Sequence, residues 1–392
     1  MPTSVMINET RILREVWLSP GISRIGLART LCLSKSAITK IVGGFLDEGL
    51  LVLAQTPDIT NSKGRRPTGL YLNGDLGVVL GIEIQTDRWF AVAHDLQGNR
   101  VDTLDPQPIR PEVELMDAID DAITVSRARQ QAHGRRTLGV GIGLSGLVNP
   151  YEGVILSSNP LGVSEPLHAT LPLQARHGVP VVIENDANCC SWKTMLEKGP
   201  DRDRNFISLL GELRPTRHAP ADGFSEVMGV AVGLGVVIKD SVLHGTGFSA
   251  GEFQSVFKTI ESPTQFNLPL ERLPDLRRDK RLWRKLMTEV ARNLSLLVNV
   301  LNVTSVIVFG DFARYPEPLV DLLWQEIQVN WLYDNEVHCN VLVDVDTTHA
   351  VASGAAAFLL HRIFSRPVVW DATPAEQSEG IDLLRAAIAG SC

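Results

Sequence analysis

The chain has 392 residues, of which 44% are hydrophobic, enough for two or three domains with sizeable cores. It holds no apolar run of about 18 residues, the length that crosses a membrane. Residues 1–10 lack the basic and apolar pattern of a secretion signal, so we expect a soluble, cytoplasmic protein. The five cysteines form no CxxC pair and have no histidine at zinc-finger spacing, which indicates neither a disulfide framework nor a metal site.

Charge is distributed unevenly along the chain. The net charge of -8 argues against nucleic-acid binding by the molecule as a whole. Residues 1–75, however, hold nine Lys or Arg against six Asp or Glu. A basic first segment on an acidic body suggests a nucleic-acid-binding module joined to a second domain.

The first segment has the pattern of three helices. From Asn8 onward, apolar residues recur at helical spacing until Pro20 and Gly21 stop the helix. Ser23 and Ser34 are placed to cap a second and a third helix. The third helix has an apolar face, formed by Ile38, Ile41, Val42, Phe45 and Leu46. Its opposite face carries the hydroxyl and amine groups of Ser34, Lys35, Ser36, Thr39 and Lys40, as a DNA-recognition helix requires.

Two short strands, residues 50–53 and 69–72, are expected to bracket a polar loop. The loop contains Arg65 and Arg66, which are suited to a narrow minor groove or to phosphates. Together, these features predict a winged helix-turn-helix DNA-binding domain over residues 1–73. The alternative is a three-helix protein-interaction module with a solvated basic loop. The residues expected to contact DNA are Ser34, Lys35, Ser36, Thr39, Lys40, Arg65 and Arg66.

Residues 74–392 show a repeated α/β pattern. We expect strands at residues 78–84, 89–94, 138–144, 181–185, 206–210, 228–238, 305–309 and 341–345. Helices are expected at residues 112–133, 282–301 and 350–363, whereas residues 154–162 are expected to be irregular. Two rounds of strands and helices predict two α/β lobes that face a cleft.

The segment 181–188, VVIENDAN, joins a buried strand to a helix and brings Asn185 and Asp186 to that junction. Asp186 can accept a proton from a hydroxyl or hold two hydroxyls, and Asn185 offers both a donor and an acceptor. These functions suit a polyol ligand. The alternative is that Asp186 only caps a helix that starts at Ala187.

Taken together, the motifs resemble the ROK family of sugar kinases and transcriptional repressors, which share an actin-like, hexokinase-like fold. In the first segment the resemblance rests on ISRIGLARTLCLSKSAITKIVGGFLDEGL and GRRP. In the second it rests on GIGLSGLV, SSNPLG, VVIENDAN, HGTGFSAGEF and VIVFG. It covers nearly the whole chain and weakens at residues 212–226 and after residue 365. The resemblance implies the repressor branch, in which a two-lobed, kinase-like effector and oligomerisation domain over residues 74–392 follows the winged helix.

The resemblance also implies that the phosphate-binding side has changed. Family kinases carry a DxGGT motif where this chain has residues 83–87, EIQTD. Bulkier side chains replace both glycines, and the additional carboxylate of Asp87 opposes an anion. We therefore expect neither a nucleotide cofactor nor enzymatic activity. The alternative is a nucleotide loop at Gly233 and Gly235, although glycine in an apolar strand also marks close packing.

The sugar-binding side is better kept. By resemblance, Asn159, Asn185, Asp186 and Glu252 match positions that hold sugar hydroxyls, and Asp186 matches the kinase general base. The family's zinc loop has no counterpart: Gln254 and Ser255 follow where the family has Gly-His, and no CxCGxxGC run occurs downstream. The expected ligand-binding residues are Ser145, Gly146, Asn159, Asn185, Asp186, Glu252, Gln254 and Ser255.

Three functions remain open. The first is a repressor that binds a double-stranded DNA operator as a homodimer or homotetramer, under the control of a sugar or sugar derivative. The second is an active sugar kinase with an accessory DNA-binding domain, which the altered phosphate motif opposes. The third is a ligand-independent regulator with a vestigial cleft, which the retained Asn185, Asp186 and Glu252 oppose. We expect the first.

Overall fold

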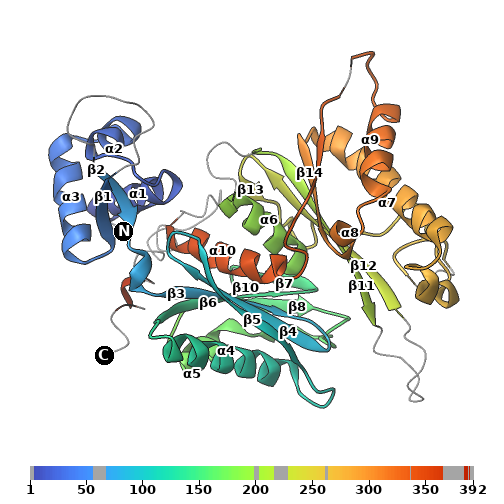
Figure 1. Cartoon of the computed structure of the whole chain (residues 1–392), viewed down its shortest axis with the longest axis horizontal. Helices are drawn as coiled ribbons and strands as arrows, with labels where there is room; N and C mark the ends of the chain where they lie inside the picture. Colours follow the sequence, from blue (N-terminus) through green and yellow to red (C-terminus); the bar gives the residue numbers. More distant parts are fainter. Residues whose placement is uncertain are drawn as a thin grey trace.

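A computed structural model describes residues 4–55, 68–197, 203–215, 228–260, 264–335, 337–364, 384–386 and 388. Figure 1 shows a small group of helices beside a larger body that is built on two sheets. We call residues 4–72 the head and the later residues the body. Within the described residues, no helix is long and apolar enough to cross a membrane.

The head contains helices α1 (Ser4–Leu18), α2 (Arg24–Leu31) and α3 (Lys35–Asp47), and strands β1 (Leu51–Gln55) and β2 (Thr68–Leu72). Both predicted helix caps are confirmed. The hydroxyl of Ser23 accepts a hydrogen bond from the Gly26 amide at 3.1 Å, and that of Ser34 accepts one from the Ala37 amide at 3.2 Å. The two predicted strands are present, and they pair antiparallel. Buried apolar residues of the three helices, among them Ile12, Leu13, Leu27, Ile38, Val42 and Phe45, form the core.

The first lobe of the body is built on a five-stranded sheet with strand order β10-β6-β3-β4-β5. Its strands are β3 (Val78–Ile84), β4 (Arg88–Asp95), β5 (Arg100–Pro108), β6 (Thr137–Leu144) and β10 (Val181–Asn185). Strands β10, β6 and β3 are parallel, whereas β4 and β5 are antiparallel to their neighbours. Helices α4 (Leu115–Ala132) and α5 (Thr170–His177) cover one face, and α10 (Ala350–Phe364) covers the other (Figure 1).

Smaller elements complete this lobe. They are the 3-10 helix η1 (Gly74–Leu76) and a three-stranded sheet of β7 (Leu147–Asn149), β8 (Val154–Ser157) and β9 (Leu167–His168). Strand β8 corrects the expectation that residues 154–162 are irregular: only the second half of that segment is. The four residues VILS, three of them apolar, form a strand that pairs with both β7 and β9.

The second lobe has its own five-stranded sheet, in the order β13-β12-β11-β14-β15. The strands are β11 (Phe206–Pro215), β12 (Met228–Ile238), β13 (Ser241–Val242), β14 (Ser305–Gly310) and β15 (Asn340–Val343). They pack with η3 (Leu270–Asp275), α7 (Lys280–Leu301), α8 (Asp311–Arg314) and α9 (Leu319–Val329) around a separate apolar core. Strand β11 extends through residue 215, and the rest of the predicted polar insertion, residues 216–226, lies outside the described residues.

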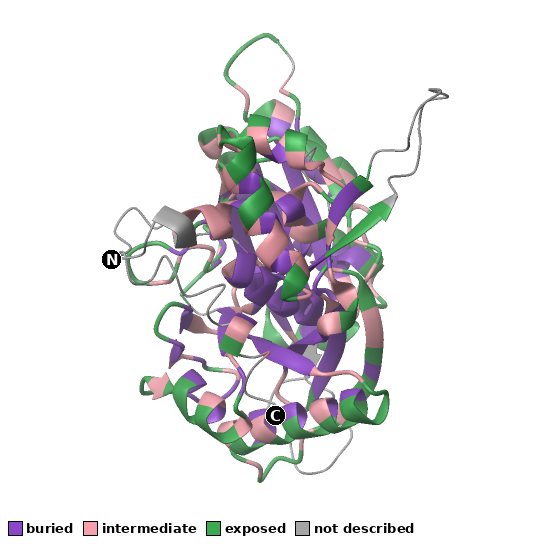
Figure 2. Cartoon of the chain, turned by 90° about the vertical axis from the view of Figure 1, so that its left-hand side faces the viewer, coloured by how far each residue is buried: buried purple, intermediate pink, exposed green. Residues whose placement is uncertain are grey.

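Helices α6 (Asp186–Glu197) and α10 lie between the two sheets (Figure 1). Helix α10 packs on β3 and β6, α6 packs on β11 and β12, and the two helices pack against each other. A side chain at Gly235 of β12 would place its Cβ 2.5 Å from the Ala187 carbonyl oxygen of α6. Glycine therefore allows close approach of strand and helix there. Figure 2 shows the buried residues concentrated through the centre of the body.

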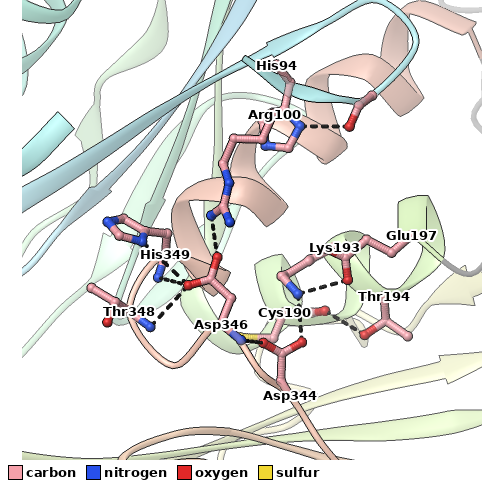
Figure 3. Close-up of polar contacts among 11 residues, drawn as sticks. His94, Arg100, Cys190, Lys193, Thr194, Glu197, Asp344, Asp346, Thr348 and His349 are labelled. Atoms are coloured by element: carbon pink, nitrogen blue, oxygen red, sulfur yellow. Dashed lines mark hydrogen bonds and ion pairs between the residues drawn. The ribbon is translucent and has the colours of Figure 1, made fainter. Parts of the chain in front are cut away.

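The chain returns from the second lobe to the first through residues 344–349, which join β15 to α10. Ion pairs hold this connection to α6 and to β5 of the first lobe (Figure 3). Lys193 of α6 lies 2.6 Å from the Asp344 carboxylate and 2.8 Å from that of Glu197, and Arg100 at the start of β5 pairs with Asp346. Burial alone would raise the pKa of Asp346, but hydrogen bonds from His349 and Arg100 lower it. Two ion pairs, at Asp344 and at Asp346, thus hold the connection in place.

Candidate functional site

The junction between β10 and α6 carries the central polar groups. The side chain of Asp186 is nearly buried. One carboxylate oxygen accepts a hydrogen bond from the Ala187 amide at 2.8 Å, and the other accepts one from the Ser145 hydroxyl. These donors, at the N-terminus of α6, fix the orientation of the Asp186 side chain. Asp186 is therefore held in position to accept hydrogen bonds from a hydroxyl-bearing ligand.

Asn185 performs the capping that was considered for Asp186. Its side-chain oxygen accepts a hydrogen bond from the Asn188 amide at 3.1 Å, which is the pattern of a helix N-cap. Its side-chain nitrogen donates to the Gly146 carbonyl oxygen at 3.1 Å. Gly146 has φ of +131°, and a Cβ there would lie 2.4 Å from the Ser157 carbonyl oxygen. The structure thus brings together Ser145, Gly146, Asn185 and Asp186 of the predicted site.

Glu184 belongs to this site but was not predicted. Its side chain is 0% exposed. One carboxylate oxygen accepts hydrogen bonds from the Asn185 amide at 2.8 Å and the Asn188 side chain at 3.2 Å. The other accepts from Trp192 Nε1 at 3.1 Å and from His244 Nε2 at 2.8 Å. A buried charge needs such partners. The sequence signal that could have indicated this residue is a glutamate near the end of an apolar strand.

His244 connects the two lobes. It follows β13 of the second lobe, yet its imidazole reaches Glu184 of the first lobe and lies 3.3 Å from the Tyr151 hydroxyl through Nδ1. Burial alone would lower the pKa of His244, but the charge and hydrogen bond of Glu184 outweigh burial and raise the pKa. Burial and the negative charge of Glu184 likewise raise the pKa of Tyr151. The contact between the lobes therefore contains a hydrogen bond from a titratable group, the His244 imidazole.

Glu252 comes from the second lobe and is exposed. Its backbone pairs with Gly233, where an added Cβ would lie 3.9 Å from a carboxylate oxygen of Asp186. The preceding residue, Gly251, has φ of +95°, and a Cβ there would lie 1.8 Å from the Leu234 carbonyl oxygen. Partial burial of its carboxyl group and the negative charge of Asp186 raise the pKa of Glu252. Two carboxyl groups from opposite lobes therefore repel each other across the site. A ligand that donates hydroxyl hydrogens to both would relieve this repulsion.

The remaining predicted ligand residues are placed differently. Asn159 is exposed in the loop that follows β8, and Gln254 is exposed. Ser255 is buried, and its hydroxyl accepts hydrogen bonds from the Phe257 amide at 3.1 Å and the Asn293 side chain at 3.2 Å. Ser255 thus braces its loop against α7. Among the described contacts, none joins Gln254 or Ser255 to Asp186.

A cavity of about 480 Å³ between the lobes is lined by the altered motif at residues 83–87. Its carboxylates come from both lobes: Glu83, Asp87, Glu212 and Asp311. Two of its cations are already paired, Arg88 with Asp87 at 2.6 Å and Arg277 with Asp311 at 3.3 Å. A nucleotide's phosphates would meet these acidic groups, which opposes their binding.

Helix α3 exposes the face that was predicted to contact DNA. Ser34, Lys35, Ser36, Thr39 and Lys40 are all exposed, whereas the opposite face is buried. The Thr39 hydroxyl donates to the Lys35 carbonyl oxygen at 2.8 Å, and the Ser34 and Ser36 hydroxyls lie 3.1 Å apart. Lys35 and Lys40 supply the exposed positive charges of this face. Arg65 and Arg66 lie outside the described residues.

Residues 79–208 match the ROK family. The xylose repressor of Bacillus subtilis is 25% identical over 253 residues, which cover 63% of this chain and 59% of that protein. The xylose repressor of Caldicellulosiruptor bescii is 24% identical over 252 residues, which cover 63% of this chain and 57% of that protein. The chain thus spans less than two thirds of these repressors. A glucokinase of Streptomyces coelicolor is 29% identical over 180 residues, 45% of this chain and 49% of that one.

Two solved structures share the fold. A ROK family transcriptional regulator, described as a homologue of the E. coli MLC protein, has a TM-score of 0.71 at 18% identity and covers 98% of this chain and 99% of that chain. A ROK family glucokinase from Streptomyces griseus, solved with glucose and AMPPNP, has a TM-score of 0.54 at 19% identity. It covers 72% of this chain and 99% of that chain. The predicted fold, a winged helix followed by a two-lobed kinase-like body, is therefore confirmed.

Proposed function

Because the chain carries a ROK family domain at residues 79–208, we propose that it is a transcriptional repressor whose DNA binding is controlled by a sugar or sugar derivative bound between its lobes. The observation that carries this proposal is the polar site at the start of α6. There Asp186 is held by Ser145 and faced by Glu252 from the other lobe. Because the two carboxyl groups come from different lobes, a polyol that binds both would favour one lobe arrangement over another.

Residues 1–73 form the DNA-binding domain in this proposal, and residues 74–392 form the effector and oligomerisation domain. The exposed Lys35 and Lys40 of α3 would contact the double-stranded operator, together with Arg65 and Arg66 of the loop between β1 and β2. Helix-turn-helix domains usually read two half-sites, so we expect the chain to act as a homodimer or a larger homo-oligomer.

A sugar kinase is the second candidate, because Asp186 is placed to accept a proton from a hydroxyl. The acidic lining of the interlobe cavity opposes it, since four carboxylates lie where both lobes would meet a nucleotide. We therefore propose a site that binds a sugar without phosphorylating it. The names of the relatives, xylose repressors and glucokinases, make xylose and glucose the first sugars to test.

The test is calorimetric titration of the full chain with xylose, glucose and a panel of sugars and amino sugars, with and without ATP and Mg²⁺. We expect one sugar to bind to saturation and ATP to leave the heat unchanged. Asp186→Asn should abolish the binding, while Asp321→Asn, at an exposed position of α9, should preserve it. Continuous heat only with ATP would identify a kinase, and no binding by any sugar would contradict the proposal.

A further inference from the structure

Helix α6 starts at the polar site and continues through the centre of the molecule. Its first ten residues, from Asp186 to Met195, are all buried. It packs on α10 of the first lobe and on β11 and β12 of the second. Lys193 ties it to Asp344, which follows β15 of the second lobe, at 2.6 Å (Figure 3). A rearrangement of the lobes therefore acts on α6 directly.

Further along α6, Trp192 also contacts the ligand site through Glu184. Its indole Nε1 donates to the Glu184 oxygen that also accepts the hydrogen bond from His244, at 3.1 Å and 2.8 Å. The two donors share one acceptor, and His244 belongs to the other lobe. A movement of His244 with its lobe would therefore remove one of the two donors from the oxygen that positions Trp192.

On its other side, Trp192 belongs to an aromatic chain that ends in the head. Its ring centroid lies 4.6 Å from that of His361 in α10. His361 lies 6.1 Å from Trp17 of the head helix α1, edge to face, and Trp17 lies 5.6 Å from Phe364. Such aromatic pairs have a preferred geometry, so a shift of one ring displaces the next. We call Trp17, Trp192 and His361 the aromatic joint.

The joint is not closely packed. A cavity of about 330 Å³ lies beside it, lined by Arg14 and Trp17 of α1, by Trp192 and Leu196 of α6, and by His361 of α10. Arg14 Nε is buried there and has no hydrogen-bond partner among the described residues. The cavity is partly open, with half-buried Leu18 and exposed Arg204 also in its lining, so it leaves α1 room for a second position relative to α6.

We infer that the aromatic joint couples the sugar site to the DNA-binding head: the lobe arrangement sets the hydrogen bond between Trp192 and Glu184, and the rings transmit it to α1. This inference rests on the proposed function for the ligands at its two ends. The joint itself is a property of the chain and is testable without either ligand.

The first experiment measures coupling in the full chain. DNA duplexes are selected by the wild type from a random library, and their affinity is measured by fluorescence anisotropy with and without saturating xylose or glucose. Allosteric effects of about 5- to 150-fold are typical. We expect His361→Ala to reduce the sugar effect to less than about threefold, with unchanged calorimetric affinity for the sugar. Trp324→Ala, at an exposed tryptophan of α9, is the control and should retain the full effect.

The second experiment needs no ligand. Hydrogen exchange of α1 amides is compared between the wild type and Glu184→Gln. The control is Glu326→Gln, at a half-buried glutamate of α9 that pairs with Arg292 of α7. We expect α1 to exchange at least about threefold faster in Glu184→Gln alone, because the joint loses its anchor. If Glu184→Gln does not fold, His244→Gln replaces it.

The outcomes separate the two proposals. Full coupling in His361→Ala, or unchanged α1 exchange when Glu184 is altered, overturns the joint. A wild type that shows no effect of sugar on DNA affinity overturns the proposed function, and the exchange experiment still decides the joint.

Discussion

Lys193 provides a strong test of how the lobes are held. Its side chain is 4% exposed and pairs with Asp344, 11% exposed, and with Glu197, 55% exposed. Lys193→Met keeps much of the aliphatic stem but leaves Asp344 as a buried carboxylate without its cation. Removing one partner of a buried ion pair costs about 3 to 5 kcal/mol. The Asp346 amide still donates to Asp344 at 2.8 Å, so we expect a loss of about 3 kcal/mol, the lower end of this range.

Guanidinium unfolding of the full chain measures this loss, and Lys280→Met, at an exposed position of α7, is the matched control. A double-mutant cycle with Asp344→Asn isolates the pair, and we expect a coupling energy of about 1 to 3 kcal/mol. A loss below about 0.5 kcal/mol in Lys193→Met, as in a surface substitution, would refute the reasoning that this pair fixes α6 to the second lobe.

Two further predictions follow from the site and the head. The raised pKa of His244 means that folding favours its protonated form, so its contribution to stability is complete below its unfolded pKa of about 6.5 and is lost as pH rises through the folded pKa. The difference in unfolding free energy between wild type and His244→Gln should therefore shrink with rising pH, and a difference that grows would contradict the assigned bond to Glu184. In the head, Lys35→Ala combined with Lys40→Ala should weaken DNA binding and reduce the salt slope by roughly two for each bound head, at about 0.9 per lost phosphate contact. Equal salt slopes for this variant and the wild type would rule out α3 as the phosphate-contacting helix.

Local patterns predicted much of this fold. Ser23 and Ser34 cap their helices because capping depends on neighbours three residues away, and strand β3 has the bounds that its apolar run indicated. Strand β5 was not predicted, since it lies at the sheet edge and most of its residues are exposed. The sequence predicts irregular chain where β8 lies, because the pairing with β7 and β9 that orders this strand has no local signal.

The candidate site was predictable only where one segment carries it. Asn185 and Asp186 are adjacent in the sequence, so their place between strand and helix was predictable. The sequence does not show that Asn185, and not Asp186, is the residue that caps α6. Glu184 and His244 were missed because their pairing joins residues 60 positions apart on different lobes. No local periodicity reports such a contact. The same limit applies to the aromatic joint, which joins three helices distant in the sequence.

The central claim is that a sugar at Asp186 controls DNA binding by the head. The most direct measurement is the affinity of the full chain for a selected DNA duplex with and without the sugar that binds in calorimetry. We predict that the sugar changes this affinity by at least about fivefold in the wild type and leaves it unchanged in Asp186→Asn, which should still bind DNA. A sugar that binds to saturation and yet leaves DNA affinity unchanged in the wild type would contradict the account.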